Sequence, residues 1–154
     1  MSRAVPRVAV LLGSQSDAPV LEPCLQTLSA LGIEHEMHVM SAHRQPEKVR
    51  EFAASAAERG FEVIIAAAGM AAHLPGVVAA GTSLPVIGVP VGKPGMSGLD
   101  ALLSIAQMPP GVPVACMAVN GGKNAALFAA AVLALKYDAV RTALERFRAE
   151  QAQP

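Results

Sequence analysis

Two side chains able to take part in chemistry stand side by side in the segment "MSAHRQP", residues 40–46. His43 is the residue type that both gives and takes a proton near neutral pH. Arg44 carries a planar fork of hydrogen-bond donors that suits a phosphate group. A lone His-Arg pair is more often a solvated part of a loop, so the argument for a site depends on the loops that lie beside it.

The segment "GSQSD", residues 13–17, has the composition of a phosphate-binding loop. Ser14 and Ser16 offer hydroxyl groups, and the helix start expected after them offers backbone N–H groups. Asp17 can accept hydrogen bonds from the hydroxyls of a ribose, although taken alone it is better explained as the N-cap of that helix. The G-x-G-x-x-G pattern of dinucleotide sites is absent.

A third loop, "AGMAAHLPG" at residues 68–76, combines small residues with a histidine. Gly69 and its small neighbours let a ligand approach the backbone. His73 and the helix start after it can hold a carboxylate or carbon dioxide, and the alternative is a structural histidine that caps this helix. His35 and His38 lie three apart in a predicted strand and therefore face opposite sides. No other spacing suggests a metal site, so we expect none.

The order of apolar runs and amphipathic stretches predicts where these loops lie. Continuous apolar runs, which we interpret as buried strands, alternate with segments of helical spacing. The expected strands are 7–12, 33–39, 63–68, 85–89 and part of 112–119, and the expected helices are 19–31, 46–59, 73–80, 98–107, 124–137 and 138–152. This alternation predicts an α/β fold: a single doubly wound domain, residues 1–154, with a five-stranded parallel sheet and a C-terminal helix. Ligands bind at the carboxyl ends of such strands, which here are followed by residues 13–17, 40–45, 69–75, 90–97 and 120–123.

The composition argues against several classes of partner. Lys and Arg together number 12, as do Asp and Glu, so no net positive field attracts a nucleic acid. The longest apolar run, residues 125–135, is shorter than the roughly 18 residues that span a bilayer, and no signal-peptide core is present. Cys24 and Cys116 are too few for a disulfide framework or a zinc site. We expect a soluble, cytoplasmic protein with no nucleic-acid or membrane partner.

Low charge and one long apolar helix predict a homo-oligomer. Charged residues make up 16% of the chain, well below the usual quarter or so. The segment "NAALFAAAVLALKY", residues 124–137, has no polar stripe between Ala125 and Leu135. A helix that is apolar all round is buried all round, so we expect it to lie between the sheet and a neighbouring subunit.

Taken together, these segments resemble the 5-(carboxyamino)imidazole ribonucleotide mutases of bacterial purine synthesis, the PurE family. The resemblance covers nearly the whole chain and is carried by "GSQSD" (13–17), "SAHR" (41–44), "AAHLPG" (71–76), "PVIGVPV" (85–91), "GLDALLSIAQMPPGVPVA" (98–115) and "KNAALFAA" (123–130). It implies a flavodoxin-like fold, a homo-octamer, a small ribonucleotide substrate and no cofactor. One departure is Met70, which stands where the family usually has a glycine.

The resemblance also implies roles for single residues. His43 would be the catalytic proton carrier. Ser14, Asp17 and Arg44 would bind the ribose phosphate, and His73 would lie near the migrating carboxyl group. The further substrate-binding residues would be Ser16, Ser41, Gly69, Ala71, Ala72 and Leu74.

The implied reaction, a step of de novo purine biosynthesis, moves a carboxyl group from an exocyclic nitrogen to carbon 4 of an imidazole ring. One histidine can protonate the nitrogen and later take the proton from the carbon, and so return to its starting state. Two alternatives stay open. One is the related carboxylase that uses free carbon dioxide, and the other is a non-catalytic flavodoxin-like domain that binds a nucleotide.

Overall fold

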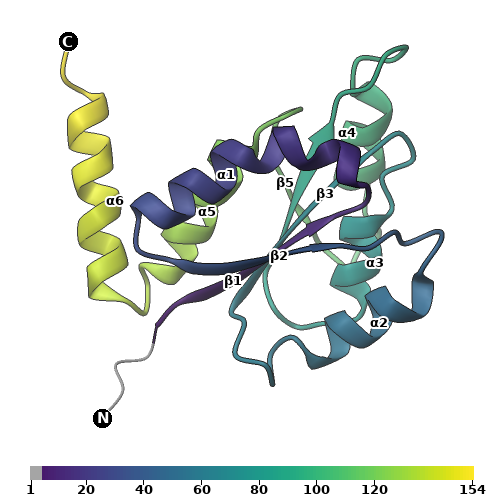
Figure 1. Ribbon diagram of the computed structural model, residues 1–154, viewed down its shortest axis with the longest axis horizontal. Coiled ribbons are helices and arrows are strands. Elements are labelled where there is room, and N and C mark those ends of the chain that lie inside the picture. Colours follow the sequence, from purple (N-terminus) through teal and green to yellow (C-terminus); the bar gives the residue numbers. More distant parts are fainter. Residues whose placement is uncertain (1–4) are drawn as a thin grey trace.

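Five parallel strands form the central sheet of the computed structural model, which describes residues 5–154 (Figure 1). The strands are β1 (Arg7–Leu12), β2 (Glu34–Val39), β3 (Val63–Gly69), β4 (Val86–Val91) and β5 (Ala115–Cys116). Their order across the sheet is β2-β1-β3-β4-β5, and every neighbouring pair is parallel. The predicted α/β, flavodoxin-like architecture is confirmed.

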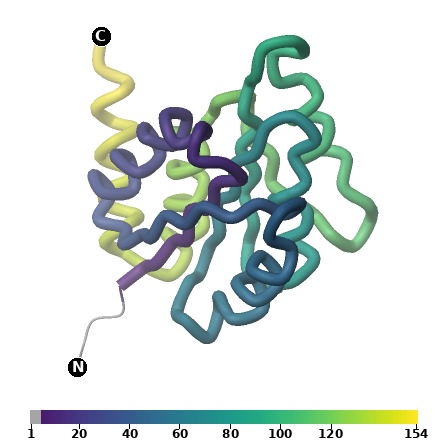
Figure 2. Tube along the Cα trace, turned by 45° about the vertical axis from the view of Figure 1, so that its right-hand side comes forward, coloured from purple at the N-terminus to yellow at the C-terminus, as the bar shows by residue number. Residues whose placement is uncertain are grey.

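Helices cover both faces of the sheet, as expected for a doubly wound fold (Figure 1). They are α1 (Ala18–Ala30), α2 (Pro46–Ser55), α3 (Leu74–Ala80), α4 (Leu99–Ala106), α5 (Gly122–Leu133) and α6 (Asp138–Gln151), with a short 3-10 helix, η1 (Gln15–Asp17), before α1. α1 and α5 pack on one face, and α2, α3 and α4 on the other. The predicted C-terminal helix is α6, which packs against α5 and is yellow in Figures 1 and 2.

The central strands send their side chains alternately into two hydrophobic cores, because successive residues of a strand face opposite sides. In β1, Val8 and Val10 pack with α1 and α5, whereas Ala9 and Leu11 pack with the helices of the other face. All four side chains are fully buried. Burial on both faces explains why residues 8–12 of β1 and 63–68 of β3 are unbroken apolar runs in the sequence.

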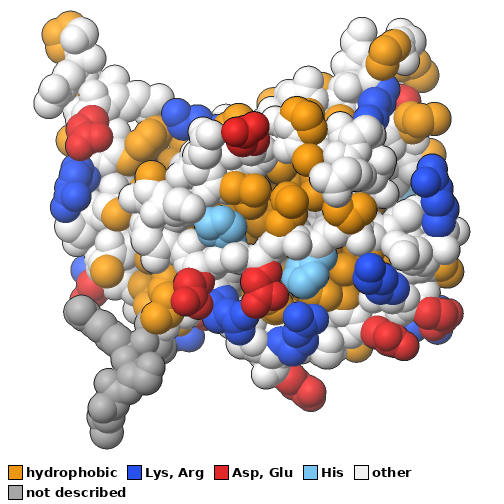
Figure 3. Space-filling model, in the orientation of Figure 1, with side chains coloured by type: hydrophobic (Ala, Val, Ile, Leu, Met, Phe, Trp, Pro, Cys, Tyr) orange, Lys and Arg blue, Asp and Glu red, His pale blue; other side chains and the backbone are white. Residues whose placement is uncertain are grey.

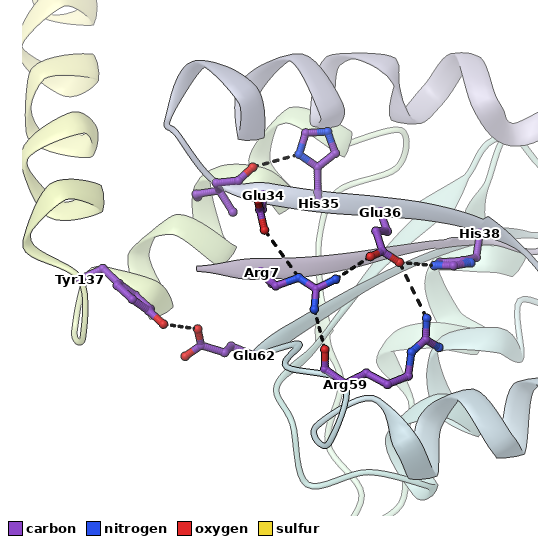
Figure 4. Close-up of polar contacts among 9 residues, drawn as sticks. Arg7, Glu34, His35, Glu36, His38, Arg59, Glu62 and Tyr137 are labelled. Atoms are coloured by element: carbon purple, nitrogen blue, oxygen red, sulfur yellow. Dashed lines mark hydrogen bonds and ion pairs between the residues drawn. The ribbon is translucent and has the colours of Figure 1, made fainter. Parts of the chain in front are cut away.

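β2 does not follow this apolar pattern, because it lies at the edge of the sheet and has the sequence "EHEMHV". The guanidinium of Arg7 donates to Oε1 of Glu36 and to the carbonyl oxygen of Arg59, both at 2.5 Å (Figure 4). Arg59 also lies 3.8 Å from Glu36 and stacks on the ring of Phe52. Charge along an edge strand discourages pairing with a second sheet. The expectation of a buried apolar run was therefore wrong for this strand.

Two elements on the sheet are shorter than expected. α2 ends at Ser55 and is followed by a turn over residues 56–60, whereas a helix to residue 59 was predicted. β5 contains two residues of the predicted segment 112–119. Pro113 lies just before β5 and has no N–H group to donate to the ladder, which shortens the pairing with β4.

α5 begins two residues earlier than predicted and ends at Leu133 rather than at residue 137. The chain turns away after Leu133 because Lys136 and Tyr137 both donate hydrogen bonds to Glu62, at 2.8 and 2.5 Å (the tyrosine bond is drawn in Figure 4). One face of α5 is buried, but Phe128 is 43% exposed. Within this chain, α5 is thus not buried all round.

The strand order creates a crevice at the carboxyl edge of the sheet. β1 lies between β2 and β3, so the chain leaves β1 toward one side and returns on the other. The loop after β1 leads to α1 on one face, and the loop after β3 leads to α3 on the opposite face. The position between β1 and β3, where the two loops diverge toward opposite faces, is the switch point of the sheet. Ligands of doubly wound folds bind in the crevice between such diverging loops.

The packing of α1 predicts an unreactive thiol. Cys24 is 0% exposed, and burial raises its pKa to about 12, so at pH 8 almost none of it is the reactive thiolate. We expect Ellman's reagent at pH 8 to leave Cys24 unmodified in a folded Cys116→Ala variant and to modify it completely after unfolding in guanidinium chloride. Rapid modification of the folded variant would show that α1 is not packed on the sheet as described.

Candidate active site

A cavity of about 400 Å³ opens at the carboxyl edge of the sheet, beside the switch point. Its wall contains all but one of the predicted site residues: Ser14, Ser16, Asp17, Ser41, His43, Arg44, Gly69, Ala71, His73 and Leu74. The exception is Ala72, which was predicted to bind substrate. It is 1% exposed and packs in the core between the sheet and α2, α3 and α4, so its side chain does not face the cavity.

His43 and His73 form a hydrogen-bonded pair in the cavity wall. His43 lies in the loop after β2, and His73 directly precedes α3. Nε2 of His43 is 2.5 Å from Nδ1 of His73, and the two rings are nearly perpendicular, at 82°. His73 makes no capping hydrogen bond to α3, so the capping interpretation of this residue was wrong.

The hydrogen bond between the two rings decides which nitrogen of His43 faces a ligand. In this bond, one ring nitrogen donates and the other accepts. Because Nε2 of His43 is engaged with His73, Nδ1 is the nitrogen of His43 that remains for a ligand.

Asp17 is the buried charge of the site. It occupies the N-cap position of α1 but makes no capping hydrogen bond, so the N-cap interpretation does not account for its side chain. The residue is 2% exposed, and its Oδ1 accepts a hydrogen bond from Nζ of Lys93 at 2.6 Å. Nζ also lies 3.2 Å from Oγ of Ser16, which is 3.0 Å from Oγ of Ser14. Two hydroxyls, an ammonium group and a carboxylate thus line this end of the cavity.

The loop after β2 brings a second cation to the cavity. Oγ of Ser41 accepts a hydrogen bond from the backbone N–H of Arg44, and the carbonyl oxygen of Ser41 accepts one from Gln45. These bonds fix the turn that places Arg44 on the cavity wall. Within residues 5–154 the guanidinium makes no hydrogen bond or ion pair with the protein. Its donors are therefore available to an anionic ligand.

The loop after β3 forms the small-residue part of the wall. A Cβ atom at Gly69 would lie 3.0 Å from Cε and 3.1 Å from Cγ of Lys93, so the glycine makes room for the lysine stem. Met70 has a left-handed backbone, with φ of 55°, which favours glycine. This conformation is consistent with the glycine that the PurE resemblance implies at this position. The Met70 side chain is 64% exposed.

Sequence reasoning missed Lys93. The loop 90–97 was expected at the carboxyl edge, and Lys93 is its only charged residue. That single cation in an edge loop was the signal that could have found it. Its contact with Asp17 could not be read from the sequence, because the two residues lie 76 positions apart.

Residues 5–154 contain neither a metal-binding cluster nor a membrane-spanning helix. No group of three or more His, Cys, Asp or Glu side chains is placed to hold a metal ion. Outside the cavity, His35 bonds to the carbonyl oxygen of Ile33 and His38 to Glu36 (Figure 4). In the same part of the chain, no helix has the length and apolar character needed to cross a membrane.

Sequence comparison relates nearly the whole chain to known enzymes. The sequence model of the family described as AIR carboxylase matches residues 7–154. A Pyrococcus abyssi protein named N5-carboxyaminoimidazole ribonucleotide mutase is 51% identical over 144 residues, 94% of this chain and 83% of that protein. A Brucella melitensis protein of the same name is 51% identical over 148 residues, 95% of this chain and 91% of that protein.

Structural comparison agrees with the sequence match. The crystal structure of Treponema denticola PurE superposes with a TM-score of 0.86 and 28% identity, and the match covers 96% of this chain and 92% of that one. Both the sequence pattern and the fold are therefore shared, and the PurE resemblance is confirmed: the chain belongs to the AIR carboxylase family.

Proposed function

We propose that the chain is an N5-carboxyaminoimidazole ribonucleotide mutase of de novo purine biosynthesis. The observation that carries the proposal is the His43–His73 pair in the wall of a cavity that also contains two cations and three serine residues. Relatives that are about half identical to the chain along most of their length bear this name. The reaction moves a carboxylate from the exocyclic nitrogen to ring carbon 4 and gives 4-carboxy-5-aminoimidazole ribonucleotide.

The polar groups of the cavity suggest how the nucleotide lies. Arg44 and the hydroxyls of Ser14 and Ser16 suit the phosphate, because a guanidinium fork and hydroxyl donors match phosphate oxygens. Asp17 suits the ribose, since an ionised carboxylate accepts hydrogen bonds from sugar hydroxyls. The base then extends toward His43, on the cavity wall formed by the loops after β2 and β3.

His43 acts first as an acid and then as a base. Its protonated ring donates a proton to the exocyclic nitrogen while the bond from that nitrogen to the carboxyl carbon breaks, which yields carbon dioxide and a neutral amine. Ring carbon 4 then attacks carbon dioxide with the electron pair of the adjacent ring double bond. Neutral His43 removes the proton from carbon 4, which restores the aromatic ring and the protonated histidine. The cycle consumes no proton or electron.

His73 orients His43, and the small residues beside it leave room for the carbon dioxide intermediate. The hydrogen bond between Nδ1 of His73 and Nε2 of His43 holds the ring of His43 in one orientation. Gly69 and Ala71, on the same wall, leave space next to the two rings for a molecule as small as carbon dioxide. A site that excludes water keeps the released carbon dioxide close to carbon 4.

A carboxylase that takes up free carbon dioxide is the second candidate. It is favoured by a Vigna aconitifolia chloroplastic phosphoribosylaminoimidazole carboxylase, which is 48% identical over 143 residues, although this chain spans 26% of that protein. The same histidine could deprotonate carbon 4 in both reactions. Relatives matched over most of their own length carry the mutase name, which favours the mutase.

We expect the purified protein to convert N5-carboxyaminoimidazole ribonucleotide without added metal, nucleotide or bicarbonate, because the proton shuttle needs only the substrate and His43. Turnover is followed by the absorbance of the product, with and without a chelator. Conversion of aminoimidazole ribonucleotide plus bicarbonate should be far slower. The reverse preference would identify a carboxylase, and tight nucleotide binding without either reaction would identify a binding domain.

We expect His43→Asn to lower kcat by about 10⁴-fold or more, at the upper end of what general acid–base groups contribute, because one group serves two proton transfers. Asn keeps a polar side chain of similar size, so the thermal midpoint and the substrate affinity should change little. His73→Asn should retain more activity, since it removes the group that orients His43 and not the proton carrier. A folded His43→Asn variant with kcat within a few-fold of the parent would rule out this mechanism.

We also propose that the protein works as a cytoplasmic homo-octamer. Apolar surface supports an oligomer: Leu135, just beyond α5, is 90% exposed, and Leu99 and Leu103 of α4 are about half exposed. Figure 3 shows a further group of hydrophobic side chains in the middle of one face, above a row of charged ones. Neighbouring subunits would cover such groups, as expected for apolar side chains that extend past the limits of one core.

We expect light scattering at micromolar concentration to give the mass of eight chains of 15.8 kDa each. Leu135→Asp should shift the protein to smaller species if Leu135 lies in a subunit contact, whereas Glu145→Asp, on the exposed side of α6, should not. A parent protein with the mass of a single chain would contradict the proposal.

A further inference from the structure

Lys93 reaches from the loop after β4 to the loop after β1. Its ammonium group donates to Oδ1 of Asp17 at 2.6 Å and to Oγ of Ser16 at 3.2 Å. The backbone next to it is held in place, because the N–H of Gly92 donates to Oδ1 of Asn120 at 2.9 Å. The stem of the lysine fills the space that the missing side chain of Gly69 leaves. Lys93 is thus a fixed part of the cavity wall and not a solvated surface lysine.

Two of the three ammonium hydrogens of Lys93 form hydrogen bonds with protein groups, namely Asp17 and Ser16. The third remains for a ligand, because a lysine ammonium has three donors and accepts nothing. The side chain is 30% exposed and lines the cavity, whereas that of Asp17 is 3% exposed. Asp17 takes hydrogen bonds from Lys93 through one oxygen only, so its other oxygen remains available to the sugar.

The position of the ammonium group points to phosphate rather than to the base. Nζ lies 3.2 Å from the hydroxyl of Ser16, which in turn lies 3.0 Å from that of Ser14. A phosphate oxygen that accepts from the hydroxyl of Ser16 therefore comes close to Nζ. Arg44, in the loop after β2, is the one other Lys or Arg on the cavity wall. A phosphate dianion between Arg44 and Lys93 would be bound from two sides.

We infer that Lys93 binds the phosphate of the substrate while it neutralises Asp17, and that it is a specificity-determining residue that makes the site select nucleotides over nucleosides. The inference rests on the proposed function. It differs from a purely positional role, in which Lys93 would hold Asp17 in place for the ribose. In that case its loss would weaken the binding of nucleotides and nucleosides equally.

Calorimetric titration can separate these roles. The ligands are 5-aminoimidazole ribonucleotide, which lacks the reactive carboxylate, and its nucleoside without phosphate. Lys93→Met keeps the length of the side chain and removes its charge. We expect it to weaken nucleotide binding by about 10- to 100-fold, the range for hydrogen bonds to charged groups. Nucleoside binding should weaken by less than about threefold, because no bond to a charged ligand group is lost. KM for the carboxylated substrate should rise more than kcat falls.

Two charge variants serve as controls. Lys93→Arg keeps the positive charge and should retain most of the nucleotide selectivity. Lys136→Met removes a lysine at the opposite edge of the sheet, where Lys136 bonds to Glu62, and should leave both affinities unchanged. Circular dichroism melting checks that each variant is folded.

If Lys93→Met fails to fold because Asp17 is left unpaired, the same comparison is made in Asp17→Asn, where no buried charge remains. There, adding Lys93→Met should still reduce the ratio of nucleotide to nucleoside affinity. Equal losses for both ligands, or no loss, would overturn the inference. Turnover of the carboxylated substrate by the parent protein tests the proposed function separately: if it occurs while Lys93→Met keeps full selectivity, only the role of Lys93 fails. A parent protein that neither binds the nucleotide nor turns over the substrate would overturn both.

Discussion

The loops that carry Asp17, His43 and His73 are positioned by the parallel pairing of β1 with β2 on one side and with β3 on the other. Leu12 pairs with Val39 and with Ala67, so the three strands end level with one another. Hydrogen bonds from Gly13 to Ala67 and from Met40 to Leu12 extend this register to the first residues of the loops. A slip of one strand by one residue would move its loop by about 3.3 Å along the strand direction. It would also move every side chain of that strand to the opposite face of the sheet. The contacts between these loops, such as that of His43 with His73, require this register.

The few charges of the chain are arranged in two different ways. At the edge strand, Arg7, Glu36 and Arg59 form an ion network that is partly open to water, where each pair contributes at most about 1 kcal/mol. In the cavity, Asp17 is almost fully buried and has Lys93 as its ion-pair partner. Removing one partner of a fully buried ion pair costs about 3–5 kcal/mol, and the 30% exposure of the Lys93 side chain lowers that cost here. The first arrangement protects the sheet edge, and the second holds a carboxylate ready for a ligand.

The sequence predicted the layers and most of the cavity wall, because both follow from local patterns. Strands buried on both faces are apolar runs, and polar residues that follow them lie at the ligand-binding edge, as His43 and Asp17 do. The roles of these residues came from the PurE resemblance rather than from the patterns. β2 was misjudged because an edge strand is free of the constraint that makes the others apolar. The His43–His73 bond and the Lys93–Asp17 bond were not foreseen, because each joins loops that only the strand order brings together: β2-β1-β3 for the two histidines and β1-β3-β4 for Lys93 and Asp17.

Backbone strain in residues 5–154 lies at the same edge as the polar groups. The three residues other than glycine with positive φ are Met70, Ser97 and Asn120, at 55°, 56° and 59°. They belong to the loops after β3, β4 and β5, and each such conformation costs about 1–3 kcal/mol unless the residue tolerates it, as asparagine does. Asn120 uses the conformation to accept the N–H of Gly92 and so to brace the loop of Lys93. β3 and β4, which precede two of these loops, are almost completely buried. Their burial offsets the free-energy cost of the strained turns. The sheet can therefore carry strained loops at its carboxyl edge, because its strands are apolar, buried and regularly paired.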